Sequence, residues 1–165
     1  MKPAVPAWRH RGEKDKIPLH YTECGLDDVY LVSGYEIDNT PYGEGLSIKN
    51  ADQLHRAIGC YMTKEKKALS GKELRFLRKQ MNLTQSELGK LLGLSSQQVA
   101  RWEKGESAIS GPADLLLRAY FIQHVGGTLD LQKLANSLED IDAPMKEKMS
   151  FENTVHGWRL LKKAA

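Results

Sequence analysis

The sequence predicts a mainly α-helical protein, in which a helical domain follows a small α+β module made of a short antiparallel sheet and a helix. A six-residue pattern typical of helix starts occurs three times between residues 69 and 99. Short β-prone runs alternate with turn-forming residues between residues 19 and 48. Apolar residues then recur at helical spacing from residue 54 to 62, and again from 115 to 138.

The N-terminal part divides into an arm and a module. Residues 1–18 combine three prolines with a run of charges, which predicts a flexible arm. Residues 19–66 form the α+β module, whose helix begins after Asn50. The strands of its antiparallel sheet are expected at Val29 to Val32, Tyr35 to Ile37 and Leu46 to Ile48.

Residues 67–142 are predicted to form the helical domain. Each copy of the repeated pattern, starting at Leu69, Leu83 and Leu94, places a Ser or Thr where it can cap a helix, with Glu or Gln three residues later. Because Gly93 ends the middle helix after about two turns, the three starts predict a tight helix-turn-helix with a supporting helix before it. Two further helices are expected from Pro112 and from Asp130.

Residues 143–165 form a tail for which the sequence gives no clear structure. Phe151, Val155, Trp158 and Leu161 are spaced to pack together if the segment is helical. With the helix from Asp130, this aromatic tail is the expected dimer surface. An apolar stripe of this kind is also typical of intramolecular core.

Charge is distributed unevenly along the chain. The 165 residues carry a net charge of +3, but Lys64 to Arg118 hold 11 Lys or Arg against 6 Asp or Glu. The excess of positive charge therefore coincides with the helix-turn-helix, as a nucleic-acid-binding surface requires, although a solvated basic face is the ordinary alternative. No apolar run reaches membrane-spanning length, so a cytoplasmic protein with no membrane partner is expected.

The third helix of this domain carries side chains suited to reading base edges. Gln97 and Gln98 can pair with adenine, Arg101 with guanine, and Ala100 can contact a thymine methyl group. Candidate phosphate contacts are Gln85 at the start of the preceding helix, Lys90, Ser96 and Lys104. The alternative is that these residues are simply the solvated side of a surface helix.

Residues 70–105 resemble the Xre/Cro/C1 family of phage-repressor-type helix-turn-helix proteins. The resemblance rests on Leu83-Thr84-Gln85-Ser86-Glu87-Leu88, Gly93-Leu94-Ser95 and Val99-Ala100-Arg101-Trp102-Glu103-Lys104-Gly105. It implies a five-helix, lambda-repressor-like domain that binds operator DNA as a dimer. It further implies that Gln85 holds a phosphate, that Ser96, Gln97 and Arg101 read bases, and that Arg78 and Glu103 form a buried salt bridge.

The whole chain also resembles the MqsA/YgiT group of antitoxin-like regulators, through Tyr21-Thr22-Glu23-Cys24-Gly25 ahead of a repressor-type domain. That group has an N-terminal zinc module built on two Cys-x-x-Cys pairs, and this chain has neither pair. The remaining candidate ligands are His20, Cys24, His55 and Cys60, so we expect a degenerate module without a cofactor, in which apolar core replaces zinc.

These observations predict a non-catalytic, sequence-specific DNA-binding transcriptional regulator that forms a homodimer. No catalytic arrangement of Ser, His, Asp or Cys and no phosphate-binding glycine loop is recognisable. The alternative function is an antitoxin that binds a toxin through residues 19–66 and regulates its own operon. A third possibility makes the same module a sensor for a small-molecule effector.

Overall fold

The computed structural model describes residues 17–141 and 148–161. The predicted flexible arm lies outside these residues except for Ile17 and Pro18, and so does the start of the predicted tail. The mainly helical fold class, with an α+β module before a helix-turn-helix domain, is confirmed. Within the described part of the chain, no helix is both long and apolar enough to cross a membrane.

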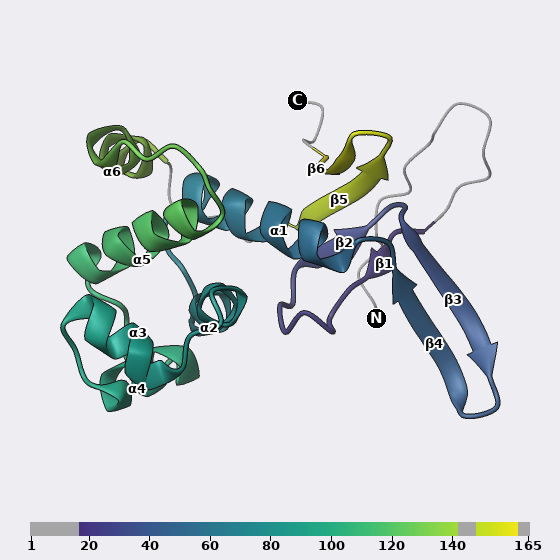
Figure 1. Ribbon diagram of the computed structural model, residues 1–165, viewed down its shortest axis with the longest axis horizontal. Helices are drawn as coiled ribbons and strands as arrows, with labels where there is room; N and C mark the ends of the chain where they lie inside the picture. Colours follow the sequence, from purple (N-terminus) through teal and green to yellow (C-terminus); the bar gives the residue numbers. More distant parts are fainter. Residues whose placement is uncertain (1–16, 142–147, 162–165) are drawn as a thin grey trace.

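The described residues form six α-helices, of which α1 (Ala51–Glu65) lies between the sheet and the helical domain (Figure 1). Asn50 caps α1, since its side-chain oxygen accepts from the backbone N–H of Gln53. The five helices of the C-terminal domain are α2 (Gly71–Gln80), α3 (Gln85–Leu92), α4 (Ser96–Lys104), α5 (Gly111–His124) and α6 (Leu131–Glu139). Local start signals therefore placed these helices correctly.

The sheet combines both ends of the described chain. Its four strands are β1 (Leu19–His20), β2 (Val29–Leu31), β5 (Met149–Thr154) and β6 (Gly157–Leu160), in the spatial order β1-β2-β5-β6. Strands β2 and β5 are parallel, with Val29 opposite Met149 and Leu31 opposite Phe151. The expected antiparallel pairing of residues 29–32 with the next two runs is therefore wrong, because β2 pairs with β1 and β5 instead.

Strands β3 (Tyr35–Thr40) and β4 (Gly43–Ile48) pair only with each other among the described residues. They form an antiparallel hairpin that extends away from the rest of the molecule (Figure 1). Ile37 and Tyr42 are exposed on this hairpin, Tyr42 completely.

The helical alternative for the tail is wrong. Residues 149–160 form a β-hairpin, with Met149 and Phe151 in the core. The turn includes Gly157, whose φ of +105° suits glycine and few other residues. Trp158 is buried too, and its indole N–H donates to the carbonyl of Lys49 at 2.8 Å. Because Phe151 and Trp158 are buried within their own chain, they do not form an exposed dimer surface.

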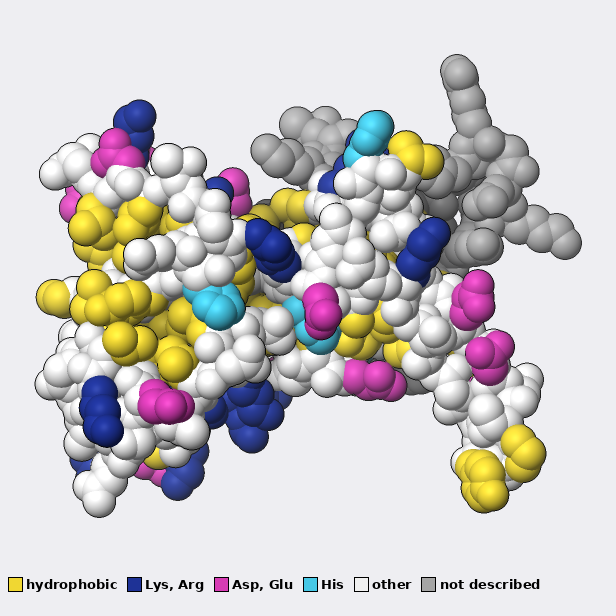
Figure 2. Space-filling model, in the orientation of Figure 1, with side chains coloured by type: hydrophobic (Ala, Val, Ile, Leu, Met, Phe, Trp, Pro, Cys, Tyr) yellow, Lys and Arg dark blue, Asp and Glu magenta, His cyan; other side chains and the backbone are white. Residues whose placement is uncertain are grey.

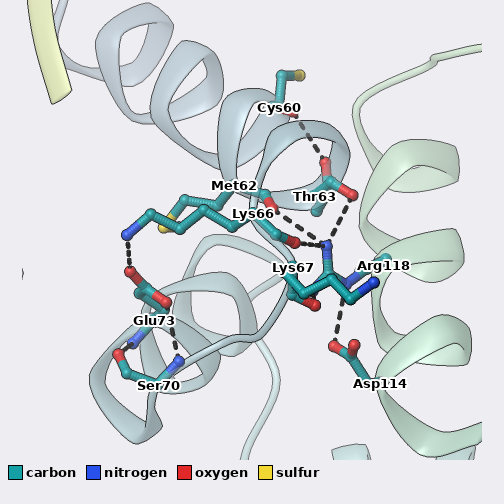
Figure 3. A network of polar contacts seen from close by, with 9 residues as sticks. All are labelled: Cys60, Met62, Thr63, Lys66, Lys67, Ser70, Glu73, Asp114 and Arg118. Carbon is teal, nitrogen blue, oxygen red and sulfur yellow. Dashed lines mark hydrogen bonds and ion pairs between the residues drawn. The ribbon is translucent and has the colours of Figure 1, made fainter. Parts of the chain in front are cut away.

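A buried arginine joins α1 to the helical domain (Figure 3). Arg118 of α5 is fully buried, and its guanidinium donates to the carbonyls of Met62, Thr63, Lys66 and Lys67, where α1 ends. Its charge is paired with Asp114, one turn earlier, at 3.0 Å. These bonds satisfy carbonyls that have no partner at a helix C-terminus, so they fix the position of α1 against α5.

Candidate nucleic-acid interface

Helices α3 and α4 form the helix-turn-helix, and α2 packs against α4. The start of α3 is a complete capping box: Thr84 Oγ1 accepts from Glu87 N at 3.1 Å, and Glu87 Oε2 accepts from Thr84 N at 2.7 Å. Ser70 and Glu73 make the same reciprocal bonds at the start of α2. The first two copies of the repeated sequence pattern are therefore capping boxes, as predicted.

The third copy departs from this pattern. Ser95 caps α4 by accepting from Gln98 N at 3.2 Å, but the side chain of Gln98 does not return to the cap. Its amide nitrogen instead donates to Ser107 Oγ, at 3.3 Å, in the loop after α4. Gln98 is half-buried, and this bond holds it toward that loop. Ser107 had no distinctive sequence signal, so this partner was not predicted.

A glycine makes the turn between α3 and α4 tight. A side chain at Gly89 would place its Cβ 2.7 Å from the carbonyl oxygen of Leu94. The backbone N–H of Leu94 donates back to Gly89 O at 2.7 Å, and Gly93 closes the turn with φ +70°. Gly89 therefore lets the backbone of the turn pack directly against α3.

Helix α4 has a buried side and an exposed side. Val99 and Trp102 are buried against the domain, with exposed fractions of 0% and 5%. On the other side Ser96, Gln97 and Arg101 are exposed, and Ala100 is half-buried. One face of the helix thus presents a hydroxyl, an amide and a guanidinium to solvent, which are the groups that read base edges.

An ion pair fixes the end of α4 to α2. Arg78 Nε and Nη2 donate to the two carboxylate oxygens of Glu103 at 2.5 and 3.1 Å, and Arg78 Nη1 donates to Leu83 O. The side chains are 11% and 5% exposed, so the pair is buried, as the family resemblance implied. Gln85 adds a third bond, from its Nε2 to Glu103 Oε2 at 2.8 Å.

The same network sets the ionisation of Glu103. Burial acts to raise the pKa of this carboxyl, but the hydrogen bonds from Arg78 and Gln85, together with the positive charge of Arg78 and of Arg75, outweigh burial and hold the pKa below its ordinary value. Gln85 is half-buried and oriented by this carboxylate at the first position of α3. Its side chain is therefore positioned by the protein before any ligand binds.

The lysines predicted to contact phosphate lie on the surface of the motif. Lys90 is exposed on α3, and Lys104 is exposed in the last turn of α4, 4.0 Å from Glu106. Arg75 of α2 is exposed as well and lies close enough to Glu103 to affect its pKa. Sequence reasoning did not select Arg75, since its nearness to Glu103 depends on how α2 packs against α4.

The four candidate zinc ligands have other partners or lie apart. His20 Nε2 lies 2.6 Å from Asp27 O, Cys24 Sγ donates to Tyr21 O, and His55 bonds to the Tyr21 hydroxyl at 2.9 Å. Cys60 is half-buried on α1. Across residues 17–141 and 148–161, no three His, Cys, Asp or Glu side chains are grouped so that they could hold a metal.

Comparison with known proteins agrees with this geometry. Residues 74–113 match a protein family described as Helix-turn-helix. The chain is also 30% identical, over 77 residues, to the antitoxin PezA of Streptococcus pneumoniae serotype 4 (strain ATCC BAA-334 / TIGR4). The match covers 46% of this chain, and the chain spans about half the length of that relative, 48%.

No solved structure matches the chain significantly. The resemblance to the MqsA/YgiT group remains a prediction, since neither match is to a protein of that group. The match to the family and the arrangement of α2, α3 and α4 agree on the same segment. Residues 74–113 therefore form a helix-turn-helix domain of the Xre/Cro/C1 type.

Proposed function

We propose that this protein is a non-catalytic, sequence-specific transcriptional regulator that inserts α4 into the major groove of double-stranded DNA. The observation that supports it most directly is the division of α4 into a buried apolar side and an exposed side carrying Ser96, Gln97 and Arg101. The major groove is wide enough for a helix, and its base edges present the donors and acceptors that these side chains complement.

In this proposal each exposed side chain of α4 has a separate role. Arg101 donates two hydrogen bonds to guanine, Gln97 pairs with adenine, and Ala100 contacts a thymine methyl group. Ser96, at the first position of α4, contacts a base or a neighbouring phosphate. Gln98 reads a base only if it exchanges its bond to Ser107, so its contribution is smaller than that of Arg101.

The phosphate contacts come from both helices of the motif. Gln85 lies at the N-terminus of α3, where free backbone N–H groups and the helix dipole favour an anion. One of its amide hydrogens is held by Glu103, which leaves the other free to donate to a phosphate oxygen. Lys90 and Lys104 supply charge on either side of the turn.

The active form is proposed to be a homodimer whose interface lies on the apolar face of the helical domain. Figure 2 shows hydrophobic side chains gathered over the helical part of the molecule. Exposed leucines of this domain are Leu91, Leu94, Leu116, Leu129 and Leu131. Pairing two copies would cover such a surface and present two α4 helices to half-sites about 34 Å apart, one turn of DNA.

Selection of bound duplexes from a random pool tests the proposal, followed by titration of variants against the selected site. Arg101→Ala should weaken binding to that site by about 1–3 kcal/mol and relax the base preference at one position. Lys90→Ala should weaken binding to all sequences alike and reduce the dependence of affinity on salt. Lys133→Ala, an exposed lysine of α6, serves as the charge-matched control. Unchanged binding by Arg101→Ala would exclude α4 as the reading helix.

A second function is supported by the match to the antitoxin PezA. In it, the protein binds a toxin through its N-terminal module and represses its own operon through the helix-turn-helix. The module offers a surface for this purpose in the hairpin of β3 and β4, where Ile37 and Tyr42 are exposed. Co-expression with the protein encoded beside its gene, followed by purification and a growth assay, tests the idea. The antitoxin function would be rejected if the two proteins formed no complex and co-expression did not relieve toxicity.

A further inference from the structure

We propose that a groove between α1, α2 and α5 is a binding site for a small multivalent anion. The groove has a volume of about 420 Å³, within the range of small-ligand sites. It is lined by residues of all three helices and of the turns that follow α2 and α5. It therefore lies where the N-terminal module meets the helix-turn-helix domain, and ligand sites are common at such boundaries.

The lining is rich in positively charged and hydrogen-bonding groups. The lining includes two cations, Arg56 of α1 and Lys79 of α2, and one carboxylate, that of Asp52. His124 adds an imidazole ring and Asn82 an amide, while His55 and Gln80, whose side chains bond to each other, complete the polar lining. Figure 2 shows histidine side chains beside basic and acidic ones where the two parts of the molecule meet. Cations with nearby amide donors are the groups that bind phosphate and carboxylate.

The C-termini of α2 and α5 lie at this groove, but they do not occupy all the hydrogen-bonding capacity of its two cations, Arg56 and Lys79. Cations are favoured at helix C-termini, and α2 and α5 both end here, so Lys79 and Arg56 also have a structural explanation. However, the terminal carbonyls of α2 already accept from the backbone N–H groups of residues 81–83. Arg56 donates to Val125 O with one nitrogen only. Lys79 forms no ion pair with any described residue, so its ammonium is available to a ligand.

An anion held here would connect the two parts of the protein. It would bridge Arg56, in the helix of the N-terminal module, to Lys79 and Asn82, at the turn that leads into α3. Asn82 has a left-handed backbone, with φ +56°, so the conformation of this turn is already restricted. The ligand would therefore act on the element that positions the first helix of the DNA-binding motif. This proposal does not depend on which DNA sequence, or which protein, the chain binds.

The test is a titration of the full chain with inorganic pyrophosphate at constant ionic strength, followed by NMR of the histidine side chains. We expect saturable shifts at His55 and His124 and none at His20 and His156. Lys79→Gln should weaken binding about tenfold or more, because it removes one charge-assisted contact. Lys79→Arg should retain binding, because it keeps the charge.

Lys133→Gln is the matched control, since Lys133 is an exposed lysine of α6 outside the groove. It should leave the shifts at His55 and His124 unchanged. Three results would each overturn the proposal: no saturation, equal affinity in Lys79→Gln, or a loss in Lys133→Gln as large as in Lys79→Gln. The last would place the anion outside the groove. Because no DNA is present, the result is independent of the proposed regulatory function.

Discussion

Arg78 and Glu103 form a buried, two-point ion pair that ties α2 to the last turn of α4. The two residues are 25 positions apart, and Gln85 at the start of α3 bonds to the same carboxylate. One carboxylate thus holds all three helices of the motif. The orientation of α4 relative to α3 therefore depends on this contact.

Removing one member of the pair should destabilise the protein strongly. Glu103→Ala leaves the Arg78 guanidinium buried without a counter-charge, so we expect a loss of about 3–5 kcal/mol in the free energy of unfolding. Urea denaturation followed by circular dichroism measures it. The double variant Arg78→Met/Glu103→Leu should lose less than Glu103→Ala, since no charge then remains unpaired. Equal losses in both variants would mean that packing, and not charge, dominates.

Gly89→Ala should destabilise the helix-turn-helix by about 1–3 kcal/mol, because the added Cβ would crowd the carbonyl of Leu94 and push α4 away from α3. The midpoint temperature of thermal unfolding and the affinity for DNA should both fall. Gly111→Ala is the matched control: it lies at the start of α5, and nothing is within 4 Å of the position its Cβ would take. If Gly89→Ala left the stability unchanged, the turn would have to relax easily around the added Cβ.

Acid should weaken the contact between the N-terminal module and α2 through His55. Burial lowers the pKa of His55 from its ordinary 6.5, and the charge of Asp52 only partly opposes this. Below about pH 6.5 the unfolded chain therefore binds more protons than the folded one, and stability falls as pH drops toward the folded pKa. His55 Nε2 is hydrogen-bonded to the Tyr21 hydroxyl, and the ring lies edge-on to Phe76.

Denaturation midpoints measured from pH 8 to pH 5 test this expectation. The His55→Gln variant should lose stability less steeply than the unchanged protein over that range, because the titrating group is gone. His156→Gln, which alters an exposed histidine in the turn between β5 and β6, is the control and should keep the full slope. A slope unaffected by His55→Gln would assign the acid sensitivity to other groups.

Phe151→Ala should destabilise the N-terminal module even though residue 151 lies beyond the helical domain. The ring is fully buried in β5, and its removal should cost about 3–5 kcal/mol. Hydrogen exchange should accelerate at the amides of β2, which pairs with β5. Val155→Ala, at a residue 96% exposed in the neighbouring turn, should change neither quantity. Unchanged exchange in β2 would mean that the sheet does not depend on this strand.

The helices were predictable because their signals are local. Ser70, Thr84 and Ser95 each cap a helix through a residue only three positions away, and Gly93 ends α3 within the same stretch. The buried pair of Arg78 and Glu103 was also anticipated, but only through the family resemblance. No local sequence pattern indicates that Arg78 and Glu103 pair with each other.

The sheet and several contacts of the site were not predictable in this way. Strand β5 finds its partner, β2, about 120 residues earlier, and no local pattern encodes such a pairing. The spacing of Phe151 and Trp158 fits a helix as well as a hairpin, so periodicity alone could not decide. Arg118 resembled any other helix residue, yet it is fully buried because the carbonyls at the end of α1 surround it.

The return of the tail to β2 makes the helical domain an insertion within the N-terminal module. During synthesis, α2 to α6 are complete before β5 has been made. These helices can therefore fold while β2 still lacks its partner strand. A chain cut short after α6 would therefore keep its DNA-binding helices and leave Leu31 and its neighbours uncovered. In the intact protein, the strands that precede and follow the inserted domain belong to one sheet, because β2 pairs with β5.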